Sequence, residues 1–368
     1  MINNPQTIQK ETNFIIVPLV NPSFDREMID FEQIQKLASL GLDGFPPEDR
    51  CYAWLALLHI YPKNPLLWQD KQIEAKKVYF DFVQLCKLED WHTKFFPNQC
   101  PDPEVFGLSN NPLMGIIHGD LVRTGRSIFF LDSFPLEGIE SHADEQDLAI
   151  YQWSGHIRRL ERILYTFGTV NKGLSYMQGF NELIVPFYWV MTKASVLFRN
   201  DLDLIEALSF ECFTTLLNET SLNEFYTTTD QSSIILHRLE DFNQLFMHHF
   251  PKVYKIIHDL DIHPVLYCFR WFNLLFSQEH DLPNLVLIWD SLFAHFDHLM
   301  DYVFYVALGH IAQVKDQLKP TSSAATLTIL QHLQISSPKE PLQIANALWE
   351  LDHAPTSKFT LFKRRFSK

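Results

Sequence analysis

Residues 151–167 read YQWSGHIRRLERILYTF, and this stretch decides the fold class. Its apolar side chains recur at steps of four, three, four and three residues: Trp153, Ile157, Leu160, Leu164 and Phe167. That spacing places them on one stripe of an α-helix. Three arginines fall off the stripe: Arg158, Arg159 and Arg162. Because charges opposite an apolar stripe usually lie on a solvated face, we expect these arginines to face solvent or, alternatively, a partner.

The same helical period recurs along most of the chain. It is found at residues 49–61, 72–87, 180–191, 235–246, 282–293 and 304–318. In the second of these segments, Val78, Phe82 and Leu85 share one face. No segment alternates steadily between apolar and polar residues, and the chain has only 12 glycines, fewer than the usual fraction of about 7%. The sequence therefore predicts an all-α fold with few tight turns.

The chain divides into a polar lead-in, a helical domain and an extension, at residues 1–29, 30–320 and 321–368. Residues 218–230 are rich in Asn, Thr and Ser and resemble a linker, with Asp230 as a suitable N-cap for the next helix. The domain is therefore expected to have two lobes, at about 30–217 and 231–320. The extension is expected to carry one short helix, about 342–350, and a basic tail.

The basic tail, residues 358–368, holds five basic residues and three phenylalanines. One interpretation is peripheral contact with an anionic membrane, where each cation contributes on the order of 1 kcal/mol. The other is an unstructured terminus, which is the more common case. The longest apolar stretch, residues 183–191, is too short to cross a bilayer and contains Pro186, so no transmembrane segment is expected.

Charge and cysteine usage exclude several classes of protein. The formal net charge of −14 argues against a nucleic-acid partner, because such proteins present basic surfaces to phosphates. The five cysteines are scattered without a C-x-x-C pair, and the start of the chain lacks the features of a signal peptide. Both observations favour a cytoplasmic protein with reduced thiols. The adjacent His248 and His249 are interpreted as structural residues, and no metal site is predicted.

Gly168 and Gly173 have the spacing of the glycines that open a phosphate-binding P-loop. Leu174 stands where that loop needs a lysine, and a helix rather than a strand precedes it. Without the lysine, the loop is not expected to hold ATP or GTP. The chain is therefore expected to have no nucleotide site and no cofactor of its own.

Two short motifs carry the residue types that accelerate GTP hydrolysis. An I-x-x-D-x-x-R pattern contains Ile117, Asp120 and Arg123, and a Y-x-Q-G pattern runs from Tyr176 through Gln178 to Gly179: both lie beside the 151–167 helix in the sequence. An arginine can neutralise developing phosphate charge and a glutamine can orient the attacking water. A structural interpretation stays open for each motif. Asp120 and Arg123 could form a surface ion pair worth about 0.2–0.5 kcal/mol, and the Y-x-Q-G residues could serve only in packing.

The flanking segments join these motifs into one ordered set. The set opens with GFPPEDR at residues 44–50 and continues through IIHGDLVRT at 116–124 and NKGLSYMQGFNEL at 171–183. It closes with FRWFNLLFSQE at 269–279 and IWDSLF at 288–293. In this order and spacing, over about residues 30–320, the chain resembles the TBC-domain family of Rab GTPase-activating proteins.

The resemblance implies an all-α, two-lobed, V-shaped domain that acts on a Rab-family small GTPase in its GTP form. Arg123 would match the arginine finger and Gln178 the glutamine finger, with Asp120 orienting Arg123. The neighbours expected to support them are Ile117, Thr124, Tyr176 and Gly179. The positions expected to be scaffold, with buried aromatic rings and a pair between the arginine and the aspartate, are Arg270, Trp271, Trp289 and Asp290. Arg50 and Trp54, in the opening segment, are also expected to be structural.

The resemblance also implies that the GTP and its Mg²⁺ are bound by the partner GTPase, and that the protein regulates vesicle traffic on endomembranes that it reaches through its Rab. Two alternatives stay open at this point. One is a Rab-binding effector or scaffold that keeps the fold without accelerating hydrolysis. The other is a helical adaptor with no GTPase partner. The presence of both finger residues argues against the first alternative, because a protein that only binds needs neither.

Overall fold

The computed structural model describes residues 14–21, 27–91, 111–124, 127, 129–132, 153–226 and 231–354. Every regular element within these ranges is an α-helix or a 3-10 helix, which confirms the all-α prediction. The basic tail and Asp230 lie outside the described residues. Across the same ranges, none of the helices combines the length and the apolar character that a membrane span needs.

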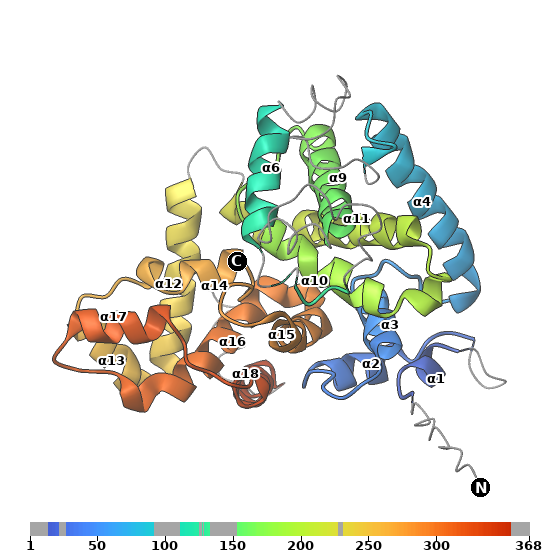
Figure 1. The fold of residues 1–368 in the computed structure, drawn as a ribbon. Coiled ribbons are helices and arrows are strands. Elements are labelled where there is room, and N and C mark those ends of the chain that lie inside the picture. Colours follow the sequence, from blue (N-terminus) through green and yellow to red (C-terminus); the bar gives the residue numbers. More distant parts are fainter. Residues whose placement is uncertain are drawn as a thin grey trace, which may run out of the picture.

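The helices form two groups, which meet where α3 and α10 pack against α15 (Figure 1). The first group contains α1 (Val17–Val20), α2 (Phe31–Ala38), α3 (Pro47–Leu57), α4 (Trp68–Leu85), α6 (Pro112–Arg123), α9 (Ser154–Val170), α10 (Phe180–Lys193) and α11 (Leu202–Glu219). The second contains α12 (Gln231–His249), α13 (Pro251–Asp259), α14 (Phe269–Asn273), α15 (Leu282–Ala294), α16 (Leu299–Val314), α17 (Ser323–Gln331) and α18 (Lys339–His353). The groups diverge from their junction, as the two-lobed shape requires.

Asp290 on α15 lies at the centre of the junction and is fully buried. Its carboxylate accepts hydrogen bonds from the backbone of Leu42 at 2.7 Å, from Trp54 Nε1 at 2.7 Å and from Arg50 Nε at 3.1 Å. Burial raises the pKa of Asp290 even though these donors favour the charged form. Asp290 therefore pairs with Arg50 and not, as expected, with Arg270, and this pair holds α3 against α15 across the two groups.

Of the other four scaffold positions, the three tryptophans are fully buried, whereas the Arg270 side chain is partly exposed. Trp54 and Trp289 pack with their rings tilted at a centroid distance of 5.9 Å, and Trp271 is fully buried on α14. Arg270 does not pair with Asp290: its Nε donates to Glu279 Oε1 at 2.7 Å. The aromatic rings therefore form the core on both sides of the junction, as expected for scaffold residues.

The three arginines of α9 are buried, so the expectation that they face solvent or a partner was wrong. Helix α9 is enclosed by α4, α6, α10 and α11, which leaves it no solvated face. Carboxylates compensate the buried charges. Glu206 on α11 accepts from Arg159 at 2.7 Å and twice from Arg162 at 2.6 Å, and Glu161 accepts from Arg158 at 2.6 Å. Paired in this way, charged residues can occupy an interior face of a helix.

The face of α4 also differs from the expected one. Val78 and Leu85 are exposed, whereas Ala75, Tyr79 and Val83 face the core. The packing of α4 on α11 selects this register, because the Tyr79 hydroxyl donates to buried Glu206 at 2.5 Å. The spacing of the apolar residues in α4 is compatible with burial of either face.

The segment that resembles a linker is helical and packed over its first part. Residues 221–225 form a 3-10 helix, and residues 227–230 lie outside the described ranges. The Tyr226 ring packs against Phe180 at a centroid distance of 4.9 Å, and its hydroxyl donates to the backbone oxygen of Asn273. The first part of this segment therefore ties α10 of one group to α14 of the other.

The extension carries two helices, α17 and α18, where one short helix was expected. Helix α18 packs along α16, and a side chain at Gly309 would collide with the backbone carbonyl of Pro341. Asn346 also donates to the backbone oxygen of Ser39 at 2.7 Å. Helix α18 therefore contacts both the second group and the N-terminal part of the first.

Candidate functional site

Arg123 is the last residue of α6, and the sequence fixes both ends of that helix. Asn111 caps the start by accepting from the backbone of Leu113 at 2.9 Å, and Pro112 occupies the first turn. Thr124 caps the end, with its hydroxyl donating to the backbone oxygen of Asp120 at 2.9 Å. Ile117 and Asp120 are buried, whereas the Arg123 side chain is 70% exposed. The I-x-x-D-x-x-R pattern therefore anchors two residues and presents the third to solvent.

Gln178 lies in the turn between α9 and α10, where it is exposed. Its side chain makes no hydrogen bond to any residue that the structure describes. Gly179 follows in the left-handed region, with φ of +105°, which strongly favours glycine. A Cβ there would also lie 2.7 Å from a methyl group of Leu274, which directly follows α14 in the second group. Gly179 thus lets the chain reverse sharply into α10 and leaves Gln178 at the surface.

Asp120 connects these two segments. One of its carboxylate oxygens accepts from Arg123 Nη2 at 2.5 Å, and the other accepts from the Tyr176 hydroxyl at 2.7 Å. Burial raises the pKa of Tyr176, and the hydrogen bond to Asp120 and that residue's negative charge raise it further. Tyr176 therefore stays a neutral donor, and one buried carboxylate holds both the arginine and the turn that carries Gln178.

Asn181 makes a second connection, and the sequence analysis did not select it as a site residue. Its Nδ2 donates to the Thr124 hydroxyl at 2.6 Å, and its Oδ1 accepts from the backbone N–H of Gly179 at 3.2 Å. The available signal was an asparagine at the start of a mostly apolar helix: the structure buries it there, and a buried amide needs partners.

Gly168, the first glycine of the incomplete P-loop pattern, has a packing role. A Cβ at this position would lie 3.0 Å from the backbone nitrogen of Tyr176, so a side chain would push the turn away from α9. Apart from the chain neighbours of Gly173, no described residue has an atom within 4 Å of the corresponding position there. Gly168 therefore helps to place the Y-x-Q-G turn.

Glu161 fixes α6 against α9 beneath the site. Its carboxylate accepts from Trp91 Nε1 at 2.8 Å and from Arg158 at 2.6 Å, and it contacts His118 Nδ1 at 2.6 Å. Complete burial opposes ionisation of Glu161, but Arg158 and His118 outweigh it and lower the pKa. A charged carboxylate therefore joins the helix that carries Arg123 to the centre of the first group.

We expect Tyr176→Phe to destabilise the protein by about 1–3 kcal/mol, because buried Asp120 would lose a hydrogen-bond donor. The free energy of unfolding in urea measures this loss. Tyr52→Phe is the matched control, because the Tyr52 hydroxyl has no hydrogen-bond partner among the described residues. Equal stability of the two variants would show that the bond to Asp120 does not hold the turn.

Comparison with known proteins finds one family that this chain resembles. A model of the Rab-GTPase-TBC domain matches residues 145–319. TBC1 domain family member 13 of Homo sapiens is 24% identical over 377 residues, covering 86% of this chain and 94% of that protein. The same values hold for TBC1 domain family member 13 of Mus musculus.

Among solved structures, the Ypt/Rab-GAP domain of Gyp1p has the same fold, with a TM-score of 0.66 at 18% sequence identity. The similarity covers 90% of this chain and 94% of that one. The match to the family model and the similarity along almost the full length of a family member agree with the motifs and their arrangement. Residues 145–319 therefore carry a Rab-GTPase-TBC domain, and the chain is similar over most of its length to members of the TBC-domain family of Rab GTPase-activating proteins.

Proposed function

We propose that this protein accelerates GTP hydrolysis by a Rab-family GTPase, to which it supplies Arg123 and Gln178. The observation that carries the proposal is the double role of Asp120, whose two oxygens bind Arg123 and Tyr176. One carboxylate thereby couples an exposed guanidinium to the turn that exposes an amide two residues after Tyr176. Two side chains that act together in one transition state need such a common support.

The geometry leaves Arg123 able to act. Asp120 binds it through Nη2, and the side chain makes no other hydrogen bond to the described residues. Its Nε and Nη1 groups can therefore donate to the oxygens of a phosphate, where the guanidinium would offset the charge of the transition state. Gln178 would orient the attacking water.

The partner supplies the remaining groups of the reaction. GTP and Mg²⁺ would be bound by the Rab in its GTP form, and this chain would contribute no cofactor of its own. The activity would take place on endomembranes in the cytoplasm, at the surface where the Rab resides, and would regulate vesicle traffic. Contact between the basic tail, residues 358–368, and an anionic membrane remains a prediction that deletion of residues 355–368 and liposome binding would test.

Single-turnover GTP hydrolysis with a panel of Rab proteins tests the proposal. Stimulation of at least one Rab is the expected result. Binding of a GTP-loaded Rab with unchanged hydrolysis would instead identify an effector. Absence of both binding and stimulation across a complete panel would favour a helical adaptor.

Gln178→Ala is expected to lower the stimulated rate by on the order of 10²-fold or more, because the attacking water loses its orienting group. Gln178→Asn should lower the stimulated rate almost as much, since the asparagine side chain is one methylene too short for its amide to reach the same position. The fold should persist in both variants because the side chain is exposed. The control is Gln84→Ala, an exposed glutamine on α4. Near-normal stimulation by Gln178→Ala would remove Gln178 from the mechanism.

A further inference from the structure

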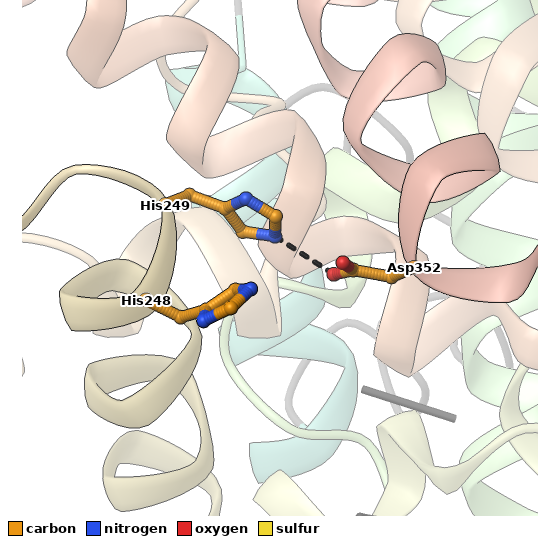
Figure 2. A group of neighbouring side chains, drawn as sticks. All are labelled: His248, His249 and Asp352. Carbon is orange, nitrogen blue, oxygen red and sulfur yellow. Dashed lines mark hydrogen bonds and ion pairs between the residues drawn. The ribbon is translucent and has the colours of Figure 1, made fainter. Parts of the chain in front are cut away.

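His248, His249 and Asp352 come together on the second group of helices, away from the motifs discussed above. The two histidines are the last residues of α12, and Asp352 lies near the end of α18 (Figure 2). One potential ligand atom from each residue lies within 4.8 Å of those of the other two. We propose that these three side chains bind a divalent transition-metal ion, with zinc as the expected ion. This proposal does not depend on the proposed function.

The end of α12 explains how adjacent histidines can serve one site. Successive side chains of a regular helix diverge by about 100°. Phe250 leaves the helix with φ of −128° before Pro251 begins α13, so His249 occupies the final position of α12. The two imidazole centroids consequently lie only 4.7 Å apart, and Figure 2 shows both rings directed toward the Asp352 carboxylate.

The donor set suits zinc, which binds imidazole nitrogen and carboxylate oxygen, whereas magnesium and calcium prefer oxygen alone. Metal–ligand distances of about 2.0–2.2 Å place tetrahedral ligands roughly 3.3–3.5 Å apart. His249 Nε2 and Asp352 Oδ2 are 2.7 Å apart and would separate slightly on binding the metal. The ligand atoms that are farthest apart, within 4.8 Å of each other, would move closer together. Exposed His248 can make this adjustment by side-chain rotation, and a water would take the fourth position.

The surroundings of Asp352 support a built site. Its side chain is 2% exposed and that of His249 is 5% exposed, so both are already held by packing. The Tyr305 hydroxyl on α16 donates to Asp352 Oδ2 at 2.8 Å and orients the carboxylate from outside the ligand set. A metal ion here would join α12 to α18 and so fasten the C-terminal extension to the second group.

Zinc titration of the full-length protein, after removal of metals with a chelator, tests the proposal. We expect one zinc ion per chain, a melting temperature that rises with zinc until the site is saturated, and reversal by EDTA. Magnesium should give no such rise. His248→Gln is the decisive variant because this exposed side chain can be replaced without disturbing the core, and zinc affinity should fall by on the order of 10²-fold.

The control variant is His258→Gln on α13. His258 lies 3.8 Å from the carboxylate of Asp259, so it reproduces a histidine–carboxylate pair without a second histidine. The His258→Gln variant should bind zinc as tightly as the wild type does. Equal zinc affinity of His248→Gln and the wild type would overturn the proposal, as would wild-type binding no tighter than that of free surface histidines. Visible absorption of bound Co²⁺ gives a second measurement: tetrahedral bands should appear in the wild type and be lost in His248→Gln.

Discussion

Arg123→Ala is expected to abolish the stimulated hydrolysis of Rab-bound GTP. An arginine supplied to a GTPase in trans contributes roughly 10³–10⁵ in rate, or about 4–7 kcal/mol of the barrier. A surface ion pair with Asp120 would be worth only about 0.2–0.5 kcal/mol. Single-turnover hydrolysis with a responsive Rab therefore separates a catalytic Arg123 from a structural one by several orders of magnitude.

The fold of Arg123→Ala should be intact, because the side chain is 70% exposed. Arg123→Lys should also lose the stimulated hydrolysis, since an ammonium group cannot present the planar edge of a guanidinium, which carries several hydrogen-bond donors. Lys172→Ala, which removes an exposed positive charge from the turn before Tyr176, controls for charge alone and should keep its activity. Near-normal stimulation by Arg123→Ala at unchanged melting temperature would exclude the arginine-finger assignment.

The residues matched by the family model begin at 145, so Arg123 lies before the matched range. Its proposed role therefore depends on the local structure rather than on that match. Asp120 is the essential link, because it holds Arg123 and the Y-x-Q-G turn with the two oxygens of one buried carboxylate. A surface ion pair alone would need neither the burial of Asp120 nor its bond to Tyr176.

The sequence predicted the helices well because helical periodicity depends on local spacing. The 3.6-residue period located α9 and α15. Asn181 was missed because its role is a contact to Thr124, 57 residues earlier, and no local pattern reports such a contact. The parts of the site that join distant segments thus required the structure.

The α9 arginines show a second limit of prediction from sequence. Apolar periodicity identifies one face that must be buried, but it does not say whether the other faces are free. In α9 the other faces are covered, and carboxylates up to 47 residues away compensate the charges. The exposed Val78 and Leu85 on α4 have a related cause, because the hydrogen bond between Tyr79 and Glu206 decides which side of that helix packs.

Glu206→Ala is expected to destabilise the protein by about 3–5 kcal/mol, enough to threaten folding. Glu206 is fully buried and accepts hydrogen bonds from Arg159, Arg162 and Tyr79. Burial lowers the pKa of Arg162, but its bonds to Glu206 more than offset this effect and keep it charged. Alanine would therefore leave two buried guanidinium groups without their main carboxylate, and the cost of these unpaired charges exceeds the value of any one bond.

Guanidinium-induced unfolding, followed by near-UV circular dichroism, measures the Glu206 effect. If Glu206→Ala cannot be purified folded, Glu206→Gln keeps the size and some hydrogen bonds and should still lower the melting temperature clearly. Glu219→Ala is the matched control, because Glu219 is an exposed residue of the same helix, and it should change stability little. A loss below about 1 kcal/mol for Glu206→Ala would mean that water or another carboxylate compensates the arginines. The centre of the first group would then not depend on this ion-pair network, and the support of α9 for the site would have to come from apolar packing alone.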